Sequence, residues 1–339
     1  MAGTDLPSFH GIIGRSAAMR VLFQRIERVA PIDVPVLIQG ETGTGKELVA
    51  RAIQRLSVRR ERRFEVVNCG ALPRELLLSE LFGHERGAFT SAVVRKVGLL
   101  AVANAGALFL DEIGELPPEA QAMLLRFLQE GEVRPVGSTE TARVNVRLIA
   151  ATHRDLEAMK ARGSFREDLY YRLRRVVLEV PLLRARREDI SLLVEHIRRE
   201  VNRRYGLAID GVTRPALSAL EHAPWPGNVR ELEAVVEQAM IFRGSGWVNL
   251  ADLDLPAPTL SGNAADRADV PMGEPLTWCQ EQALSIASGG IGVRRRDLMG
   301  RCRISREAAR HHLTSLVSRG LLRRVGRGRA TRYVPESAG

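Results

Sequence analysis

Lysine is almost absent from this chain. Lys46, Lys96 and Lys160 are its only lysines among 50 basic residues, so arginine supplies nearly all of the positive charge. A compositionally biased genome explains an arginine excess of this kind, and the total alone therefore indicates no function. An ammonium is a compact charge and a guanidinium a planar fork, so each remaining lysine is a candidate for a specific role.

Cysteines and long apolar runs are scarce as well. The three cysteines Cys69, Cys279 and Cys302 are far apart and form no CxxC or Cys/His arrangement, which predicts neither a disulfide framework nor a zinc site. No apolar run approaches the roughly 18 residues of a membrane helix, and the start of the chain lacks a basic segment followed by an apolar one. We expect a cytoplasmic protein with no membrane contact, in a reducing compartment.

What is present is ordinary for a globular protein, except for the distribution of charge. Hydrophobic residues make up 45% and charged residues 27% of the 339, which excludes wholesale disorder and fibrous classes. The net charge is +10, and residues 276–339 contribute +9 of it, from 13 arginines and four acids. A basic tail of this kind is typical of a segment that binds nucleic acid or another anionic surface.

Hydrophobic periodicity divides the chain into segments. Apolar runs at 36–38, 108–110 and 148–150 alternate with helical patterns up to about Val180, which predicts a parallel sheet covered by helices on both faces. After Pro181 we expect no strands, but a small helical subdomain. The segment 251–275 is rich in Pro, Ala, Asp and Gly and is predicted to be a flexible linker.

A glycine-rich loop follows the first of these strands. Its glycines let backbone N–H groups point at phosphate oxygens, the next helix presents its positive end, and Lys46 supplies a compact charge for the β- and γ-phosphates. The alternative is an ordinary turn at the start of a helix. Glu47 stands where a hydroxyl normally contacts magnesium. The predicted nucleotide-binding residues are Gly40, Glu41, Thr42, Gly43, Thr44, Gly45, Lys46 and Glu47.

The strand at 106–110 ends in two carboxylates, Asp111 and Glu112. Asp111 is the candidate Mg²⁺ ligand, and Glu112 the candidate base that polarises water for attack on the γ-phosphate. A solvated acidic turn is the commoner explanation of such a pair in general. The catalytic interpretation is favoured here because a phosphate loop belongs to the same sheet and ligands bind at the carboxyl ends of parallel strands.

Six blocks of sequence follow one another along the chain: GETGTGKE (40–47), ELFGHERGAFTSA (80–92), GALFLDEIGELP (106–117), LIAATHRDL (148–156), FREDLYYRL (165–173) and WPGNVRELE (225–233). In this order they resemble the ATPase domain of the bacterial enhancer-binding proteins, the AAA+ activators of sigma-54 RNA polymerase, over Phe9 to Leu250. The resemblance implies an α/β subdomain at 9–183, a helical lid at 184–250, binding of ATP and Mg²⁺, and a homo-oligomeric ring, a hexamer.

The resemblance also implies roles for residues around the nucleotide. Asn68 is expected to hold Glu112 away from water, although a buried amide satisfied by backbone is the alternative. Thr152 and His153 are expected to sense the γ-phosphate, and Arg230 to contact nucleotide from the lid.

Two arginines are expected to act on a neighbouring subunit. Arg166 and Arg172 resemble fingers that reach into the adjacent site, where a guanidinium neutralises charge on the transferred phosphoryl group. The alternative is a pair of surface ion pairs with Glu167 and Asp168.

The output element implied by the resemblance is the loop that contacts sigma-54, where the family has GAFTGA. In this chain Ser91 replaces the second glycine of that motif, and serine is less able than glycine to adopt positive φ angles. The segment 131–144 resembles the second loop that moves with it. The alternative to a sigma-54 contact is that Phe89 is an ordinary aromatic residue of the core. The predicted sigma-54-contacting residues are Gly87, Ala88, Phe89, Thr90, Ser91 and Ala92.

The basic tail resembles a winged helix-turn-helix, over 276–335. We expect helices at 276–287, 294–299 and 306–319, a turn at 301–304, and two strands around 326–328. A basic hairpin after a protein-interaction bundle is the alternative. The candidate DNA-binding residues are Arg306, Arg310, His311 and Ser315 on the third helix and Arg327 and Arg329 in the wing.

These features predict an ATP-driven activator that binds double-stranded DNA upstream of promoters and remodels the closed complex of the sigma-54 RNA polymerase holoenzyme. Only a few residues precede the match, so we expect no receiver domain, and regulation by a protein in trans, by expression level or by DNA-promoted assembly. A DNA-binding repressor or sigma-70 regulator that uses ATP only for assembly is the second hypothesis, with Ser91 its one supporting feature. A DNA translocase, the third, does not explain the block at 87–92.

Overall fold

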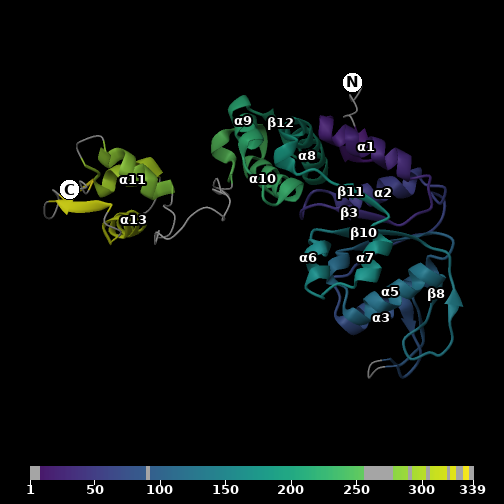
Figure 1. Cartoon of the computed structure of the whole chain (residues 1–339). Helices are drawn as coiled ribbons and strands as arrows, with labels where there is room; N and C mark the ends of the chain where they lie inside the picture. The colour runs from purple at the N-terminus through teal and green to yellow at the C-terminus, as the bar shows by residue number, and fades with distance from the viewer. Residues whose placement is uncertain are drawn as a thin grey trace. The chain divides into compact units, whose positions relative to one another are not determined.

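The computed structural model describes residues 8–88, 92–255, 278–288, 292–302, 306–318, 321–325 and 331–335. The chain divides into two compact units, residues 1–260 and 261–339 (Figure 1). Each unit has its own hydrophobic core, and each is described by itself below.

Five parallel strands form the sheet of the first unit. Their order across the sheet is β11 (Val176–Glu179), β3 (Val36–Gln39), β10 (Arg147–Thr152), β7 (Ala107–Asp111) and β4 (Phe64–Asn68). This confirms the predicted parallel sheet. The register places Asn68 beside Asp111, and Gln39 beside Thr152, so the carboxyl ends of the strands that carry the expected site meet at one edge.

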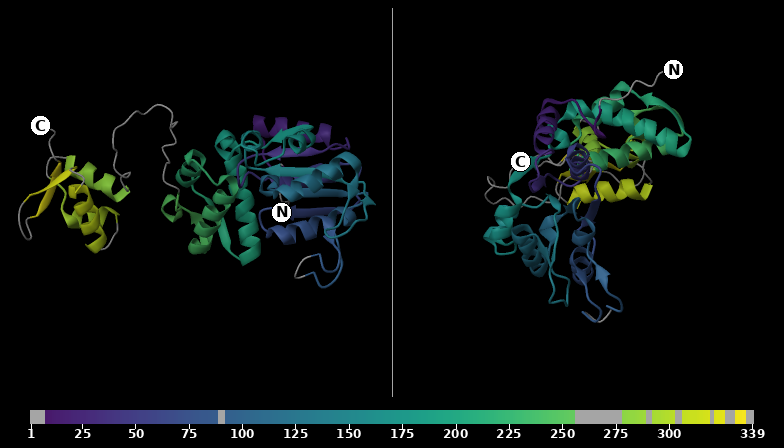
Figure 2. Two further views of the ribbon diagram at one scale, coloured as in Figure 1. Left: turned by 60° about the horizontal axis from the view of Figure 1, so that its bottom comes forward. Right: turned by 90° about the vertical axis from the view of Figure 1, so that its right-hand side faces the viewer.

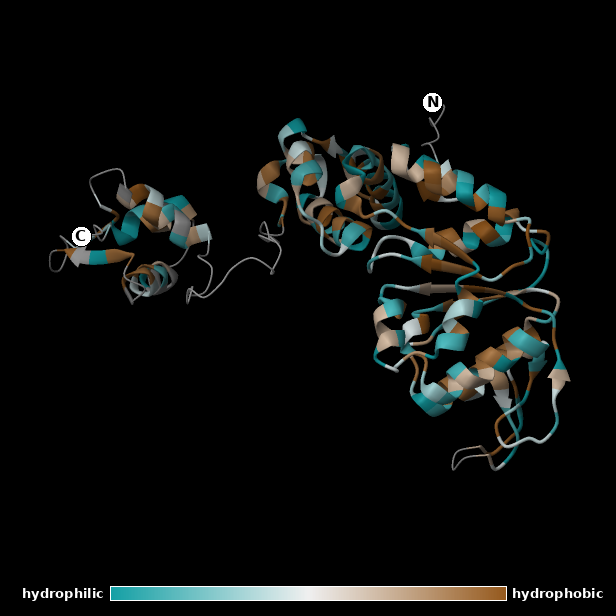
Figure 3. Cartoon of the chain, viewed as in Figure 1, coloured by the Kyte–Doolittle hydropathy of each residue, from teal (hydrophilic) through white to brown (hydrophobic). Residues whose placement is uncertain are grey.

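Helices cover both faces of this sheet (Figure 2). Val36 and Ile38 pack with α1 (Ala17–Val29) and α2 (Lys46–Leu56), whereas Leu37 between them packs with α3 (Arg74–Phe82), α5 (Pro118–Glu130) and α7 (Glu167–Leu173). Side chains of successive strand residues point to opposite faces, so a strand buried on both sides is apolar throughout. The hydrophobic colour of β3 shows this (Figure 3).

A helical subdomain follows the sheet. It comprises α8 (Ile190–Tyr205), α9 (Arg214–His222) and α10 (Asn228–Arg243) around the fully buried Trp225. Contrary to expectation, it also contains two paired parallel strands, β12 (Ala208–Val212) and β13 (Ser245–Val248). Strand-disfavouring Asp and Gly residues in these short segments hid the strands in the sequence.

The start of the predicted linker belongs to this subdomain instead. A short 3₁₀ helix, η4, covers Leu250–Asp252, and Leu253 and Leu255 pack against the core of the helices. These two leucines bury apolar surface, so the lid extends beyond residue 250. Residues 256–275, the rest of that linker, lie outside the described part of the chain.

Short elements connect these parts. Their bounds are β1 (Ser8–Phe9), β2 (Ile12–Ile13), β5 (Gly83–His84), β6 (Lys96–Val97), α4 (Leu99–Val102), η1 (Ile113–Glu115), β8 (Glu132–Val133), β9 (Ala142–Arg143), α6 (Leu156–Ala161), η2 (Leu183–Ala185) and η3 (Arg187–Asp189).

In its described residues, the second unit has three helices and an antiparallel hairpin: α11 (Trp278–Ser288), α12 (Arg295–Cys302), α13 (Arg306–Ser318), β14 (Leu322–Val325) and β15 (Arg332–Pro335). Val293 pairs with Tyr333 and adds a bridge to the hairpin. Ala309, Leu313 and Leu316 of α13 are buried. The turn expected from residue 301 is wrong at its start, because α12 continues through Cys302.

Within the described ranges, no helix has the length and apolar character needed to cross a membrane.

Candidate nucleotide-binding and catalytic site

The glycine-rich loop lies between β3 and α2, and two of its glycines are required by geometry. Gly43 and Gly45 have φ angles of +78° and +98°, in the left-handed region that favours glycine. A Cβ atom on Gly43 would also stand 2.1 Å from the carbonyl oxygen of Gly227 in the lid. The lid therefore packs directly on the loop, with no room for a side chain between them.

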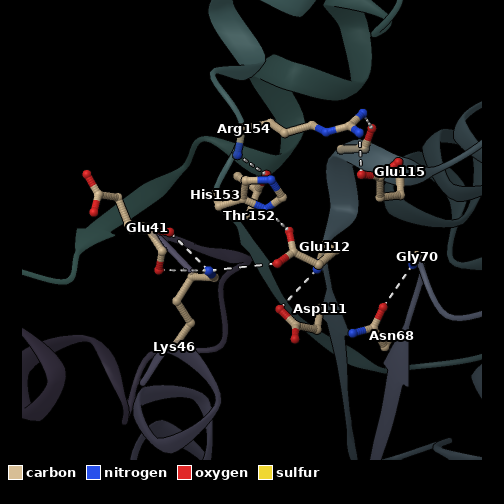
Figure 4. A network of polar contacts seen from close by, with 12 residues as sticks. Glu41, Lys46, Asn68, Gly70, Asp111, Glu112, Glu115, Thr152, His153 and Arg154 are labelled. Carbon is tan, nitrogen blue, oxygen red and sulfur yellow. Dashed lines mark hydrogen bonds and ion pairs between the residues drawn. The ribbon is translucent and has the colours of Figure 1, made fainter. Parts of the chain in front are cut away.

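Lys46, the first residue of α2, is nearly buried at 7% exposure. Its Nζ donates hydrogen bonds to the carbonyl oxygens of Gly40 (3.0 Å) and Glu41 (3.3 Å), and lies 3.9 Å from Glu112 Oε1 (Figure 4). Burial lowers the pKa of Lys46, and the attraction of Glu112 and Asp111 opposes this shift. A desolvated ammonium held in this way is ready to meet phosphate oxygens.

The two carboxylates follow β7 at the sheet edge. Burial, assisted by the neighbouring Glu112, raises the pKa of Asp111, whose Oδ1 accepts a hydrogen bond from the Glu112 N–H at 3.0 Å. Glu112 has a φ of +53°, unusual for a residue with a side chain. In this conformation its carboxylate faces Lys46 rather than continuing the strand (Figure 4).

His153, and not Asn68, contacts Glu112 in this structure. Glu112 Oε2 lies 2.5 Å from His153 Nδ1 at the end of β10. Asn68 lies at the same edge, but its Oδ1 accepts a hydrogen bond from the Gly70 N–H at 2.9 Å (Figure 4). The contact expected of Asn68 is therefore made by His153.

Thr152, the other expected phosphate sensor, is buried at the end of β10. Its Oγ1 accepts a hydrogen bond from Arg154 N at 3.0 Å, and its carbonyl accepts one from Gly40 N at 3.2 Å. Thr152 thus links the phosphate loop to the strand that carries His153.

A cavity of about 470 Å³ opens where these elements meet the lid. This volume lies within the range of small-molecule sites. Apolar side chains, the glycine-rich loop and the strand-tip carboxylates all line it. Its lining includes Ile12, Ile13, Leu193, Val229, Arg230, Asn68, Asp111, Glu112 and the loop residues Thr42, Gly43, Thr44, Gly45, Lys46 and Glu47.

The sequence analysis missed Asn228, which joins the lid to the loop. Its Oδ1 accepts a hydrogen bond from Leu183 N at 2.9 Å, and its Nδ2 donates to Glu41 Oε2 and to the carbonyl of Thr42, each at 3.1 Å. Asn228 is fully buried with a φ of +54°, a conformation that asparagine tolerates. An asparagine after Pro-Gly at the start of a helix was the available signal.

Arg186 was missed as well. It is 3% exposed, its Nη2 donates to the carbonyl of Thr44 at 3.1 Å, and it lines the cavity. Burial lowers the pKa of Arg186, while Asp189 opposes the shift. It lies in an arginine-dense run, where nothing in the sequence distinguishes it from its neighbours.

The two expected fingers lie away from the cavity of their own chain. Arg166 forms an ion pair with Asp168 at 2.8 Å, with both side chains about half exposed, which is the alternative interpretation for this residue. Arg172 is a half-buried residue of α7. Neither lines the nucleotide cavity.

The base of the expected output loop is held between two segments. Gly87 N donates to the carbonyl of Ala92 at 2.8 Å, and Glu85 N to that of Val136 at 3.0 Å. A Cβ built on Gly137 would come 2.8 Å from the Cβ of Ala88, so the segment at 131–144 touches the loop. Phe89, Thr90 and Ser91 lie outside the described residues.

The expected DNA-binding residues belong to the second unit. Arg310 is exposed on α13, whereas the Ser315 hydroxyl accepts a hydrogen bond from Gln280 Nε2 at 3.0 Å and faces α11. Arg306 and His311 belong to α13, but their side chains are not among those described; Arg327 and Arg329 lie outside the described residues.

Comparison with known proteins agrees with this geometry. The family described as the sigma-54 interaction domain matches residues 12–179, and the AAA+ ATPase lid domain matches residues 184–268. The transcriptional regulatory protein ZraR of Salmonella typhi is 44% identical over 314 residues, which cover 88% of this chain and 70% of ZraR. The chain belongs to the sigma-54-dependent transcriptional activators. It is accordingly an AAA+ ATPase.

The chain is also similar to FhlA and to solved structures of NtrX. The formate hydrogenlyase transcriptional activator FhlA of Escherichia coli K12 is 50% identical over 252 residues, which are 74% of this chain but 36% of FhlA. The crystal structure of NtrX from Brucella abortus in complex with ATP superposes with a TM-score of 0.66 at 36% identity, covering 90% of this chain and 69% of NtrX. A second NtrX structure contains ADP and has a TM-score of 0.67 at 35% identity and 90% and 68% coverage.

Proposed function

We propose that this activator assembles as a hexameric ring in the cytoplasm, hydrolyses ATP between adjacent subunits, and uses the energy to remodel the closed complex of sigma-54 RNA polymerase. One observation carries the enzymatic part: Lys46, Asp111 and Glu112 meet in a single cavity that the lid closes. A phosphate-binding cation, a metal-binding carboxylate and a base are the groups that phosphoryl transfer to water requires.

Nucleotide binding is assigned to the lining of this cavity. The phosphate loop and Lys46 receive the phosphates, because the start of α2 presents backbone N–H groups and positive charge. Ile12, Ile13, Leu193 and Val229 provide an apolar wall that suits a nucleotide base. Arg230 lines the cavity from the lid and contacts the nucleotide there.

Asp111 is the residue proposed to hold Mg²⁺. No group of three or more His, Cys, Asp or Glu residues in the described chain forms a metal site by itself. The donor set therefore fits an ion bound jointly by one carboxylate and by phosphate oxygens. Glu47, in the position usually occupied by a hydroxyl, pairs with Arg51 at 2.6 Å and so is directed along the surface of α2.

Glu112 is proposed to activate the attacking water. In the present structure its two oxygens are directed to His153 and Lys46. For Glu112 to accept a proton from water, the contact with His153 must open. We propose that His153 senses the γ-phosphate through this contact and that Asn68 takes part at the same edge in another nucleotide state.

The output of hydrolysis is assigned to the loop at 87–92, and promoter selection to the second unit. The block containing this loop falls within the matched sigma-54 interaction domain. Three helices followed by a hairpin, in the most basic part of the chain, support a winged helix-turn-helix that binds double-stranded DNA through α13.

Transcription in vitro from a sigma-54 promoter tests the proposal. The full chain with hydrolysable ATP is expected to produce open complexes with sigma-54 polymerase, and none with a non-hydrolysable analogue or with sigma-70 polymerase. If the chain activates neither polymerase, the proposal is wrong. An effect limited to the sigma-70 enzyme would support a repressor or sigma-70 regulator instead.

A further inference from the structure

Glu41 brings a carboxylate into the glycine-rich loop. Among the described residues, Thr42 and the loop residues after it line the nucleotide cavity, whereas Glu41 does not. Figure 4 shows its carboxylate directed away from Lys46. A negative charge beside a site proposed for phosphates requires compensation, because it repels the ligand that the site has to bind.

The backbone of Glu41 belongs to the site although its side chain does not. Its carbonyl oxygen accepts hydrogen bonds from Lys46 Nζ at 3.3 Å and from Thr44 Oγ1 at 2.8 Å. A change in the orientation of Glu41 therefore displaces an acceptor of the lysine that is proposed to receive the phosphates.

Arg184 contacts this carboxylate from η2, the short helix that follows β11. Its Nη1 donates to Glu41 Oε2 at 3.1 Å and its Nη2 to Oε1 at 2.9 Å, so the guanidinium binds both oxygens. These hydrogen bonds lower the pKa of Glu41 against the opposing effect of burial. A planar guanidinium is suited to this two-point contact, which fixes the direction of the carboxylate as well as compensating its charge.

Asn228 shows how close the carboxylate lies to the cavity wall. Its Nδ2 donates at 3.1 Å both to Glu41 Oε2 and to the carbonyl oxygen of Thr42, a residue that lines the cavity. Without Arg184, an ionised carboxylate would remain beside this wall, where it would repel phosphate groups. Repulsion of this kind becomes weaker as salt screens it.

We propose that Arg184 is a positioning residue for nucleotide binding, which neutralises the Glu41 carboxylate and holds it outside the nucleotide cavity. Arg184 acts through Glu41 and the loop, without contact to the nucleotide, and the inference rests on the proposed nucleotide site. Both side chains of the pair are 43% exposed. An ion pair exposed to this extent contributes little to the stability of the fold, so its loss should change nucleotide affinity more than stability.

Removal of the arginine, and then of the carboxylate, tests this role in the full chain. Arg184→Gln should bind a fluorescent ATP analogue with Mg²⁺ about two- to fivefold more weakly at low salt, the size of a half-exposed charge interaction. The double variant Arg184→Gln/Glu41→Gln has no carboxylate to repel the phosphates and should regain most of this affinity. Arg187→Gln is the matched control, because it removes the same charge from an exposed position of η3, and it should bind as the natural chain does.

Two further measurements separate the effect of charge from an effect of structure. Arg184→Lys keeps the cation without the fork and should restore most of the affinity that Arg184→Gln loses. The difference between Arg184→Gln and the natural chain should shrink as the NaCl concentration is raised. An affinity of Arg184→Gln equal to that of Arg187→Gln, or a double variant that binds no more tightly than Arg184→Gln, would overturn the inference.

Lys46→Ala distinguishes failure of this inference from failure of the proposed site. If Lys46→Ala loses the analogue while Arg184→Gln binds it normally, the site stands and only the role of Arg184 is wrong. If Lys46→Ala binds the analogue normally, the proposed site is wrong, and the inference that rests on it is wrong as well.

Discussion

Glu112 has two partners, and they affect it in opposite ways. Lys46 Nζ, at 3.9 Å, attracts one carboxylate oxygen toward the glycine-rich loop, whereas His153, at 2.5 Å, occupies the other oxygen, which water must reach in the proposed mechanism. As the proposed base, Glu112 lies at the cavity, but its contact with His153 keeps one carboxylate oxygen from accepting a proton from water. In the proposed mechanism, hydrolysis therefore requires the contact between Glu112 and His153 to open.

Glu112→Gln should keep ATP binding and remove turnover. The amide retains the size of the side chain but cannot accept the proton of water, and a positioned base contributes about 10²–10⁴-fold to such a step. Titration with a fluorescent ATP analogue and a phosphate-release assay measure the two properties. Lys46→Ala is the comparison, and is expected to lose binding itself. Phosphate release by Glu112→Gln within a few-fold of the natural chain would show that another residue is the base.

Asn228→Ala should weaken both the fold and the site. It leaves the buried Leu183 N–H without its acceptor, which costs about 1–3 kcal/mol, and it places alanine at a φ of +54°. Asn228→Gly is the matched control, because glycine tolerates that φ while losing the same hydrogen bonds. We expect urea unfolding to give the alanine variant the larger loss and both variants a lower ATP affinity. An alanine variant as stable as the natural chain would contradict this.

At the scale of elements, the sequence best predicts the strands and loops that a hydrophobic pattern or local chemistry determines. The runs in β3, β7 and β10 are buried on both sides and so had to be apolar, which made the parallel sheet predictable. The loop glycines and Lys46 were predictable because phosphate binding constrains them locally. The partner of Glu112 was not, because it depends on which of two side chains, at the ends of the strands on either side of β7, turns toward it. Asp210 and Gly211 hid β12, and Gly246 hid β13.

Contact between the two loops should matter for output and not for hydrolysis. Gly137→Ala adds a methyl group 2.8 Å from the Cβ of Ala88 and displaces the base of the 87–92 loop. We expect ATP hydrolysis within a few-fold of normal and open-complex formation reduced by about tenfold or more, on the scale of a side-chain overlap of 1–3 kcal/mol. Gly206→Ala is the control, because its φ of +66° is equally strained but its Cβ meets nothing within 4 Å. If both variants activate transcription equally, the contact between the two loops has no role in output.

Helix α8 should have an acid-sensitive contribution to stability. Two arginines, Arg198 first and Arg199 second, hydrogen-bond Glu195 and lower its pKa from 4.5 to about 2. A pKa lowered by folding stabilises the fold above the unfolded value, and this stability is lost as the pH falls from about 4.5 toward 2.

Comparison with a neutral variant isolates this effect. Glu195→Gln should cost about 0.5–1 kcal/mol at pH 7, a modest value because the carboxylate is one-third exposed, and the difference from the natural chain should shrink at pH 3. Glu61→Gln, at an 89% exposed carboxylate, is the control. Unfolding free energies from urea titrations at the two pH values measure both. If the difference in unfolding free energy does not change with pH, altered packing explains the effect of Glu195→Gln.

At the scale of the whole molecule, the described cavity is lined by the glycine-rich loop and by the proposed metal ligand and base, Asp111 and Glu112, but by neither Arg166 nor Arg172. Arg166 and Arg172 lie on and beside α7, outside the cavity of their own chain. A single chain thus holds the nucleotide without supplying the external guanidinium that the resemblance implies. This arrangement supports the proposal that hydrolysis requires the assembled ring, in which a neighbour would complete each site.

Mixing two inactive variants tests this division of labour. Lys46→Ala destroys its own site but keeps its arginines, whereas Arg172→Ala keeps its phosphate loop but lacks a finger. In mixed rings, an Arg172→Ala site beside a Lys46→Ala subunit receives an intact Arg172, so phosphate release should rise at least about tenfold above that of either variant alone, since a finger contributes about 10³–10⁵-fold. A mixture of Lys46→Ala with the double variant Lys46→Ala/Arg172→Ala is the control and should stay inactive. If the first mixture also stays inactive while light scattering shows mixed rings, Arg172 does not act across the interface, and Arg166 must be tested in the same way.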